Sequence, residues 1–117
     1  MSSLSNREEN VRVLVVEPNK EPEIRVIKNE LDSFREIVGG YIECVPLPIG
    51  MDTYYLVCNE EGKLLGLPPN RKVGQDIIVG TFLIVKADRE EFVSLNEYEA
   101  SAIARNFIDE VYQPPFP

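Results

Sequence analysis

The stretch 56–71 constrains the fold of this chain more than any other, because several strong backbone signals follow one another within it. An apolar run is followed by Asn-Glu-Glu-Gly at 59–62, which is typical of a tight turn. A leucine-rich segment, 63–67, comes next, and Pro-Pro-Asn at 68–70 then fixes two φ angles. We therefore predict a hairpin of strands 53–58 and 63–67, followed by a rigid corner and a loop.

The other strands are predicted from β-branched content and from alternation of polar and apolar residues. Residues 11–17 are rich in valine, as in a strand covered on both faces, whereas residues 23–28 alternate. Residues 41–48 form a further strand that ends at prolines. The most apolar run, 76–86, predicts one central strand in which Gly80 marks a bulge or a close backbone approach.

Two helices are predicted. Asn29 is a candidate N-cap for a short helix that ends at Gly39-Gly40. A capping box at 94–97 precedes the best amphipathic pattern, which runs from Ala100 to Val111. Together the elements predict an α+β fold: a mainly antiparallel sheet of about five to six strands, with one short helix and one C-terminal amphipathic helix packed on it.

The length of 117 residues fits one domain. We predict a flexible leader over residues 1–10, a single α+β domain over residues 11–112 and a proline-rich tail over residues 113–117. No segment reads as a signal peptide or a membrane span. Cys44 and Cys58 lie in apolar alternating runs, which predicts buried, reduced thiols and a cytoplasmic protein.

Acidic residues outnumber basic ones, 20 to 12, which gives a formal net charge of −8. Direct binding to nucleic acid is disfavoured, because that binding needs clustered basic residues. The acidity serves solubility in one interpretation, and in the other it offers an acidic face to a basic protein surface. The chain has no histidine, the commonest general base and metal ligand. We recognise no catalytic pair, metal site or cofactor motif, and predict a protein that is not an enzyme.

Several motifs resemble those of an uncharacterised family of small domains. The motifs lie at residues 13–18, 37–43, 45–47, 59–71 and 78–81. The family carries only a domain-of-unknown-function label, DUF3846, and is common in bacteriophages, mobile elements and Gram-positive bacteria. The resemblance implies a mobile-element context, and it carries over no catalytic residue.

Three groups of residues are candidate sites. Asn70, Arg71 and Lys72 follow the rigid corner, so their side chains start from a fixed backbone and are suited to hold a phosphate or carboxylate. Their alternative is a turn followed by a solvated basic pair. Asn59, Glu60 and Glu61 form an acidic recognition loop, half of a cation site or a simple hairpin turn.

The third group is Glu43 with Tyr41, on the strand 41–48. Alternation places the two side chains on the same side of that strand. Glu43 is then either a partly buried carboxylate with a raised pKa or a residue of the solvated face.

Two functional hypotheses follow. The first is a small acidic interaction protein of phage or mobile-element type, without enzymatic activity, that binds a host protein with a basic surface and modulates or inhibits it. Inhibition of a host defence component is one form of this hypothesis. The alternative is a small-ligand module, in which residues 70–72 with Glu43 or Tyr41 hold a nucleotide or another anionic metabolite.

Overall fold

The computed structural model describes residues 8–108, which form eight strands and two helices. The strands are β1 (Asn10–Val16), β2 (Glu23–Lys28), β3 (Ile42–Leu47), β4 (Thr53–Asn59), β5 (Pro69–Val73), β6 (Asp76–Val79), β7 (Phe82–Asp88) and β8 (Glu91–Val93), and the helices are α1 (Leu31–Val38) and α2 (Glu97–Ile108). Every strand pairing is antiparallel. The predicted α+β class, with a short helix and a C-terminal helix, is confirmed.

Six of the strands form one sheet with the order β2-β1-β7-β4-β3, and β8 pairs with β7 as well. β4 occupies one edge of β7 over almost its whole length. β1 and β8 share the other edge, since β1 pairs with residues 82–84 and β8 with residues 86–88. β5 and β6 form a separate two-stranded ribbon.

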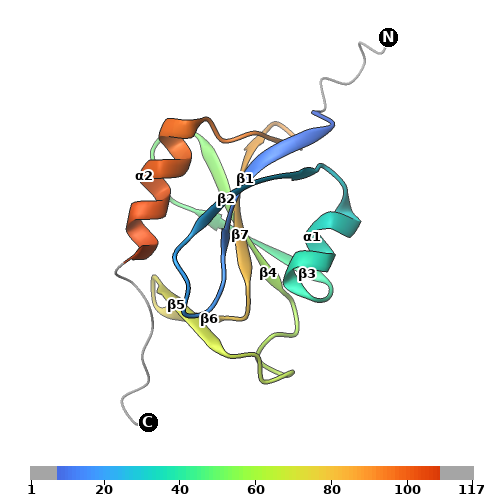
Figure 1. Ribbon diagram of the computed structural model, residues 1–117, viewed down its shortest axis with the longest axis vertical. Helices are drawn as coiled ribbons and strands as arrows, with labels where there is room; N and C mark the ends of the chain where they lie inside the picture. The colour runs from blue at the N-terminus through green and yellow to red at the C-terminus, as the bar shows by residue number, and fades with distance from the viewer. Residues whose placement is uncertain (1–7, 109–117) are drawn as a thin grey trace.

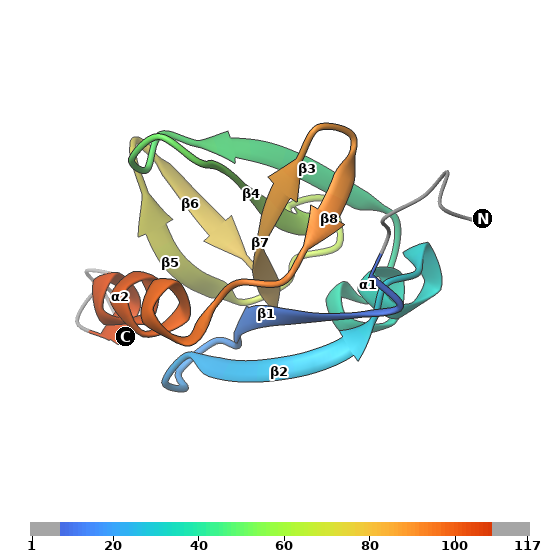
Figure 2. The same ribbon diagram turned by 90° about the horizontal axis from the view of Figure 1, so that it is seen from above.

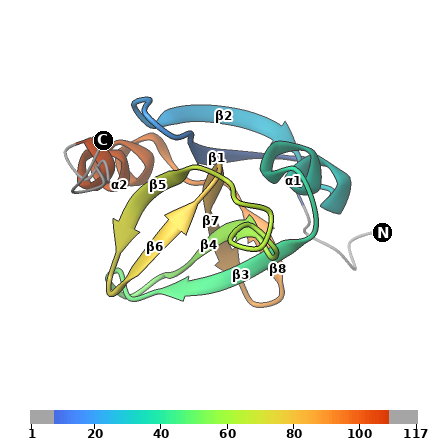
Figure 3. The same ribbon diagram turned by 90° about the horizontal axis from the view of Figure 1, so that it is seen from below.

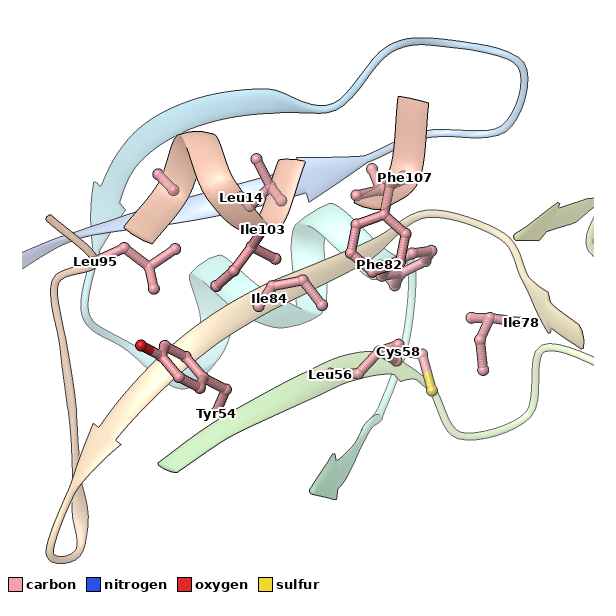
Figure 4. Close-up of a cluster of buried hydrophobic side chains, with 12 residues drawn as sticks. Leu14, Tyr54, Leu56, Cys58, Ile78, Phe82, Ile84, Leu95, Ile103 and Phe107 are labelled. Atoms are coloured by element: carbon pink, nitrogen blue, oxygen red, sulfur yellow. The ribbon is translucent and has the colours of Figure 1, made fainter. Parts of the chain in front are cut away.

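Alternate residues of the central strands build two separate cores, one on each face of the sheet. Figures 1 and 2 show α2 and the β5–β6 ribbon beside one face and α1 beside the other. The first core takes even-numbered residues of β1, β4 and β7, and the second takes odd-numbered ones. In Figure 4, Ile103 and Phe107 reach from α2 toward Ile84 and Phe82, and the two phenylalanine rings meet edge to face at 5.6 Å.

The ends of both helices differ from the prediction. Asn29 does not cap α1: its amide is buried and donates instead to the carbonyl oxygens of Glu8 and Phe92. The capping box of α2 lies two residues later than predicted, at Asn96 and Glu99. The backbone N–H of each residue donates to a side-chain oxygen of the other at 2.8 Å. The predicted last helical contact, Val111, lies outside the described residues.

The chain is already bonded to the domain at residue 8, within the predicted leader. The backbone N–H of Ser94 donates to the carboxylate of Glu8 at 2.7 Å, and that of Asn29 donates to the carbonyl oxygen of Glu9 at 2.9 Å. Residues 1–7 and the predicted tail, 113–117, lie outside the described residues.

Three predicted strands or loops are wrong. Residues 63–67 form a turn, not a strand, and the predicted corner and loop contain β5. The predicted central strand 76–86 is two strands in different sheets, separated at Gly80, whose φ is +74°. Only glycine adopts that φ at low cost, so the chain changes direction there.

The two cysteines also differ from each other. Cys58 is buried, as predicted, and burial together with the charge of Glu43 raises the pKa of its thiol to about 11. Cys44 is exposed, contrary to the prediction, and lies on β3, an edge strand of the large sheet. Both thiols are free.

Candidate partner-binding surface

Most side chains of the motif at 59–71 are used inside the protein. Asn59 is buried, and its amide nitrogen donates to the carbonyl oxygen of Val38 at 3.1 Å. Its side-chain oxygen accepts the backbone N–H of Glu61 at 2.8 Å. One side chain thus joins the end of α1 to the end of β4 and starts the turn that follows.

Two glycines let this turn approach the β5–β6 ribbon. A Cβ on Gly62 would lie 2.9 Å from a methyl carbon of Val79, and a Cβ on Gly80 would lie 2.7 Å from a methyl carbon of Leu67. Both distances are shorter than normal contacts between carbon atoms. Any larger residue would therefore push the turn away from the ribbon.

Asn70 and Arg71, predicted as ligand-binding residues, are fully buried. Asn70 donates to the carbonyl oxygens of Val16 and Gly80 at 2.9 and 2.8 Å. Its side-chain oxygen accepts a bond of 2.7 Å from Arg71. The two residues are partners of each other and of the backbone, so they connect β5 to the large sheet.

The guanidinium of Arg71 also binds two distant carbonyl oxygens, those of Phe107 at 2.8 Å and Lys20 at 2.6 Å. Phe107 lies in the last turn of α2, where the negative end of the helix dipole favours a cation. Burial lowers the pKa of Arg71, but an arginine starts so high that it stays charged.

The five residues of the predicted anion site are therefore not brought together at one open position. Asn70 and Arg71 are enclosed, while Lys72 is exposed and lines a different groove, between β3 and the end of α2. Glu43 lies in β3 and Tyr41 two residues before it, just outside the strand, and both residues are exposed. Because Arg71 is buried in the core, the predicted site lacks its main anion-binding residue.

The turn after β4, residues 60–66, is compact and presents two leucines to solvent. Its backbone is closed by three hydrogen bonds, from the N–H groups of residues 65, 66 and 67 to the carbonyl oxygens of residues 61, 63 and 62. Leu64 is 87% exposed and Leu65 is 60% exposed. Figures 1 and 3 show this yellow-green segment at one end of the molecule, next to β5 in the chain.

Three of the predicted site residues, Tyr41, Glu43 and Glu60, lie in or beside this turn. Glu43, Glu60 and Leu64 line a pocket of about 150 Å³, at whose wall Lys63 and Asp76 form an ion pair of 2.5 Å. Tyr41 is joined to the turn because its carbonyl oxygen accepts the backbone N–H of Glu60 at 2.8 Å.

Tyr41 is 61% exposed, and the guanidinium of Arg35 lies 4.9 Å from the centre of its ring. This contact fixes the ring by a cation–π interaction on one face. We refer to six residues together as the candidate surface: Tyr41, Glu43, Glu60, Glu61, Leu64 and Leu65.

Sequence reasoning missed Leu64 and Leu65 because it placed both in a strand. The sequence alone gives one usable hint, since Gly62 and Gly66 bracket the two leucines and favour a turn.

A cluster of ionisable side chains lies elsewhere, where β4, β7 and α2 meet. The hydroxyl of Tyr54 donates to the carboxylate of Glu99, which also pairs with Lys86 at 2.8 Å. Burial, together with this hydrogen bond, raises the pKa of Tyr54. Burial alone would raise the pKa of Glu99, but the bonds from Asn96, Lys86 and Tyr54 outweigh it and lower that pKa. The three side chains hold α2 on the sheet.

Residues 8–108 contain neither a cluster of metal-ligand side chains nor a helix able to cross a membrane. Within that range no group of three or more His, Cys, Asp or Glu side chains is placed to hold a metal ion. Neither of the two helices described there has the length and apolar character needed to cross a bilayer.

Comparison with the sequence models of known families gives a match over residues 11–108. The sequence model of the family described as "Domain of unknown function (DUF3846)" matches residues 11–108. Searches of curated proteins and of solved structures find no match to the chain.

Proposed function

This chain belongs to the DUF3846 family, and we propose that it is a small acidic interaction protein, without enzymatic activity, that binds a host protein and modulates or inhibits it. The proposed setting is a phage or another mobile element, acting in the host cytoplasm, where the free thiols of Cys44 and Cys58 stay reduced. Inhibition of a host defence component is one form of this function.

The observation that carries the proposal is the exposure of Leu64 and Leu65 on a turn that is otherwise bonded internally. Folding leaves most of the surface of these two side chains in contact with water, yet the residues around them hold their backbone in place. A pre-ordered apolar pair loses little conformational entropy when a partner covers it. An apolar centre within a polar rim is the usual arrangement of a protein interface.

The charges around the leucines favour a basic partner. Glu43, Glu60 and Glu61 are exposed beside the pair, and the whole chain carries a net charge of −8. An acidic rim speeds association with a basic surface and rejects acidic ones. The partner therefore has an apolar centre surrounded by lysine or arginine.

The test compares proteins captured from host lysate by the tagged full chain and by variants. Leu64→Ser/Leu65→Ser removes the apolar pair without touching the core. We expect its affinity for the captured partner to fall about thirtyfold, as for a hot spot worth about 2 kcal/mol. Met51→Ser is the matched control, because Met51 is fully exposed on the distant β3–β4 connection.

Two results would contradict the proposal. One is equal capture by the double serine variant and the wild type. The other is an equal loss of capture with Met51→Ser, since weaker nonspecific hydrophobic binding would then explain the result for both variants. Circular dichroism of each variant confirms that the fold is retained.

A further inference from the structure

A second pocket lies on the opposite face of the sheet, the one covered by α1. It has a volume of about 340 Å³, and its apolar wall consists of Leu31, Phe34, Ile42 and Phe92. The rings of Phe34 and Phe92 meet edge to face with centroids 5.3 Å apart. Because α1 has only eight residues, it covers part of this face and leaves the pocket open beside its first turn.

The rim of this pocket is acidic. Glu30 is the residue before α1. Glu90 lies in the turn between β7 and β8, and Glu91 is the first residue of β8. The carboxylates of Glu30 and Glu90 are exposed and form no ion pair with any residue from 8 to 108. A neighbouring hollow that shares Glu30 continues the acidic surface toward Glu9.

These properties select one class of occupant. An anion would be repelled by the rim. A purely apolar group would fill the floor of the pocket. It would also displace water from the rim carboxylates without offering them a hydrogen bond or a positive charge in return. A lysine or arginine side chain meets both demands, because its alkyl stem packs on apolar surface while its charged head stays at the rim.

We propose that this pocket receives a lysine or arginine side chain of a protein partner. The stem lies against Leu31 and Phe92, and the cationic head lies between Glu30 and Glu90. The pocket volume is near the lower limit for ligand sites, which suits one side chain rather than a large cofactor.

The inference deepens the proposed function and rests on it for the partner, since it names a second contact for the same basic protein. The pocket and the candidate surface lie on opposite sheet faces, and their ends meet near the start of β3, where Ile42 lines the pocket and Tyr41 belongs to the surface. A partner that wraps this end of the molecule reaches both.

The test uses the full chain labelled with ¹⁵N and two small probes that differ only in the side-chain ammonium group. The first is Nα-acetyl-lysine methylamide, and the second is the norleucine compound, which has the same stem without the ammonium group. We expect saturable shifts at the amides of Phe34, Ile42 and Phe92 with the lysine probe. The norleucine probe should bind about fivefold more weakly, as expected for two exposed charge pairs.

Variants separate the rim from general electrostatics. Glu30→Gln/Glu90→Gln should reduce binding of the lysine probe to the level of the norleucine probe. Glu36→Gln, on an exposed position of α1 that does not line the pocket, should leave it unchanged. The dispersion of the amide spectrum shows that each variant is folded.

The inference is overturned if the lysine probe causes no saturable shift, if both probes bind equally, or if the double glutamine variant binds like the wild type. The outcome is independent of lysate capture. If the probe binds but the chain captures no partner, only the proposed function is overturned. If capture depends on Leu64 and Leu65 but the probe does not bind, only the inference about the pocket is overturned.

Discussion

At the scale of single residues, the guanidinium of Arg71 connects parts of the chain that are far apart in sequence. It binds the last turn of α2 through Phe107, the β1–β2 turn through Lys20, and its neighbour Asn70. All three acceptors are neutral oxygens. A charged donor makes stronger hydrogen bonds than a neutral one, and the fork of an arginine reaches several acceptors at once.

Arg71→Ala should therefore be severely destabilising. It removes the donors of three acceptors, and a buried acceptor without a partner costs about 1–3 kcal/mol. We expect a loss of roughly 3 kcal/mol or more in the free energy of unfolding, measured with urea. Arg71→Lys should lose an intermediate amount, because one ammonium cannot reproduce the fork.

The neighbouring exposed residue provides the control. Lys72→Ala should change the stability by no more than about 0.5 kcal/mol, since its side chain is exposed. A loss below about 1 kcal/mol for Arg71→Ala would show that the three acceptors find water or other donors.

Glu99 makes a second residue-scale prediction, on pH. Its pKa is lowered in the folded protein, so its stabilising effect is complete above the unfolded pKa of about 4.3 and is lost as pH falls through the folded value. Glu99→Gln should lower the stability at neutral pH by about 1–2 kcal/mol and flatten the loss of stability below pH about 4.3.

Lys86 extends the same prediction to alkaline pH. The bond to Glu99 raises the pKa of Lys86, so its contribution is present below the unfolded pKa of about 10.4 and is lost as pH rises through the folded value. Thermal unfolding of Glu99→Gln across both ranges checks this. Glu97→Gln, exposed in the same helical turn, is the control, and an unchanged acid limb in Glu99→Gln would contradict the assignment.

At the scale of elements, the break between β6 and β7 depends on Gly80. This glycine combines a φ of +74° with a close approach to Leu67, while Gly74 has a φ of +61° and open space around it. Alanine substitutions at these two glycines therefore separate the cost of backbone strain from the cost of steric overlap with Leu67. Gly74→Ala tests the first alone, and Gly80→Ala tests both.

We expect Gly74→Ala to cost about 1–2 kcal/mol, the cost of a left-handed alanine. Gly80→Ala should cost about 1–3 kcal/mol more, because Leu67 must move to make room for the new methyl group. Urea denaturation of the two variants measures the difference. Equal losses would mean that Leu67 adapts freely and that the break depends on φ alone.

Local patterns predict the strands that are paired in a regular way. The alternating residues 23–28 form β2 and the apolar run 53–58 lies in β4, so both strands are found within a residue of the prediction. The segment 63–67 has equally apolar residues but forms a turn. Its conformation depends on contacts of Gly62 and Leu67 with the β5–β6 ribbon, and no local pattern contains that information.

The site residues show the same division. Tyr41, Glu43 and Glu60 were each candidates from the sequence, but they become one surface only because Ile42 pairs with Asn59. Arg71 follows two prolines and a polar residue, which is a typical exposed sequence, yet it is buried. Its acceptor in α2 is 36 residues away, so its burial is a tertiary property.

At the scale of the whole molecule, the sheet separates two cores, so each helix stabilises a different face. The surface that surrounds both is acidic, with 20 acidic and 12 basic residues in the chain. Most ion pairs among residues 8–108 are exposed, the exception being Lys86 with Glu99. Exposed pairs contribute little, so repulsion among the excess carboxylates is the larger electrostatic term.

Salt should therefore stabilise this protein. Raising the ionic strength from about 0.01 M to about 0.15 M shortens the Debye length from about 30 Å to about 8 Å, which screens repulsion across the molecule more than contacts within an ion pair. We expect the melting temperature at pH 7 to rise by about 2–4 °C, equivalent to somewhat less than 1 kcal/mol. At pH 4, where many carboxyls are protonated, the rise should shrink because the net charge is smaller. Calorimetry in NaCl at both pH values measures this, and a melting temperature that falls with salt at pH 7 would show that the ion pairs outweigh the repulsion.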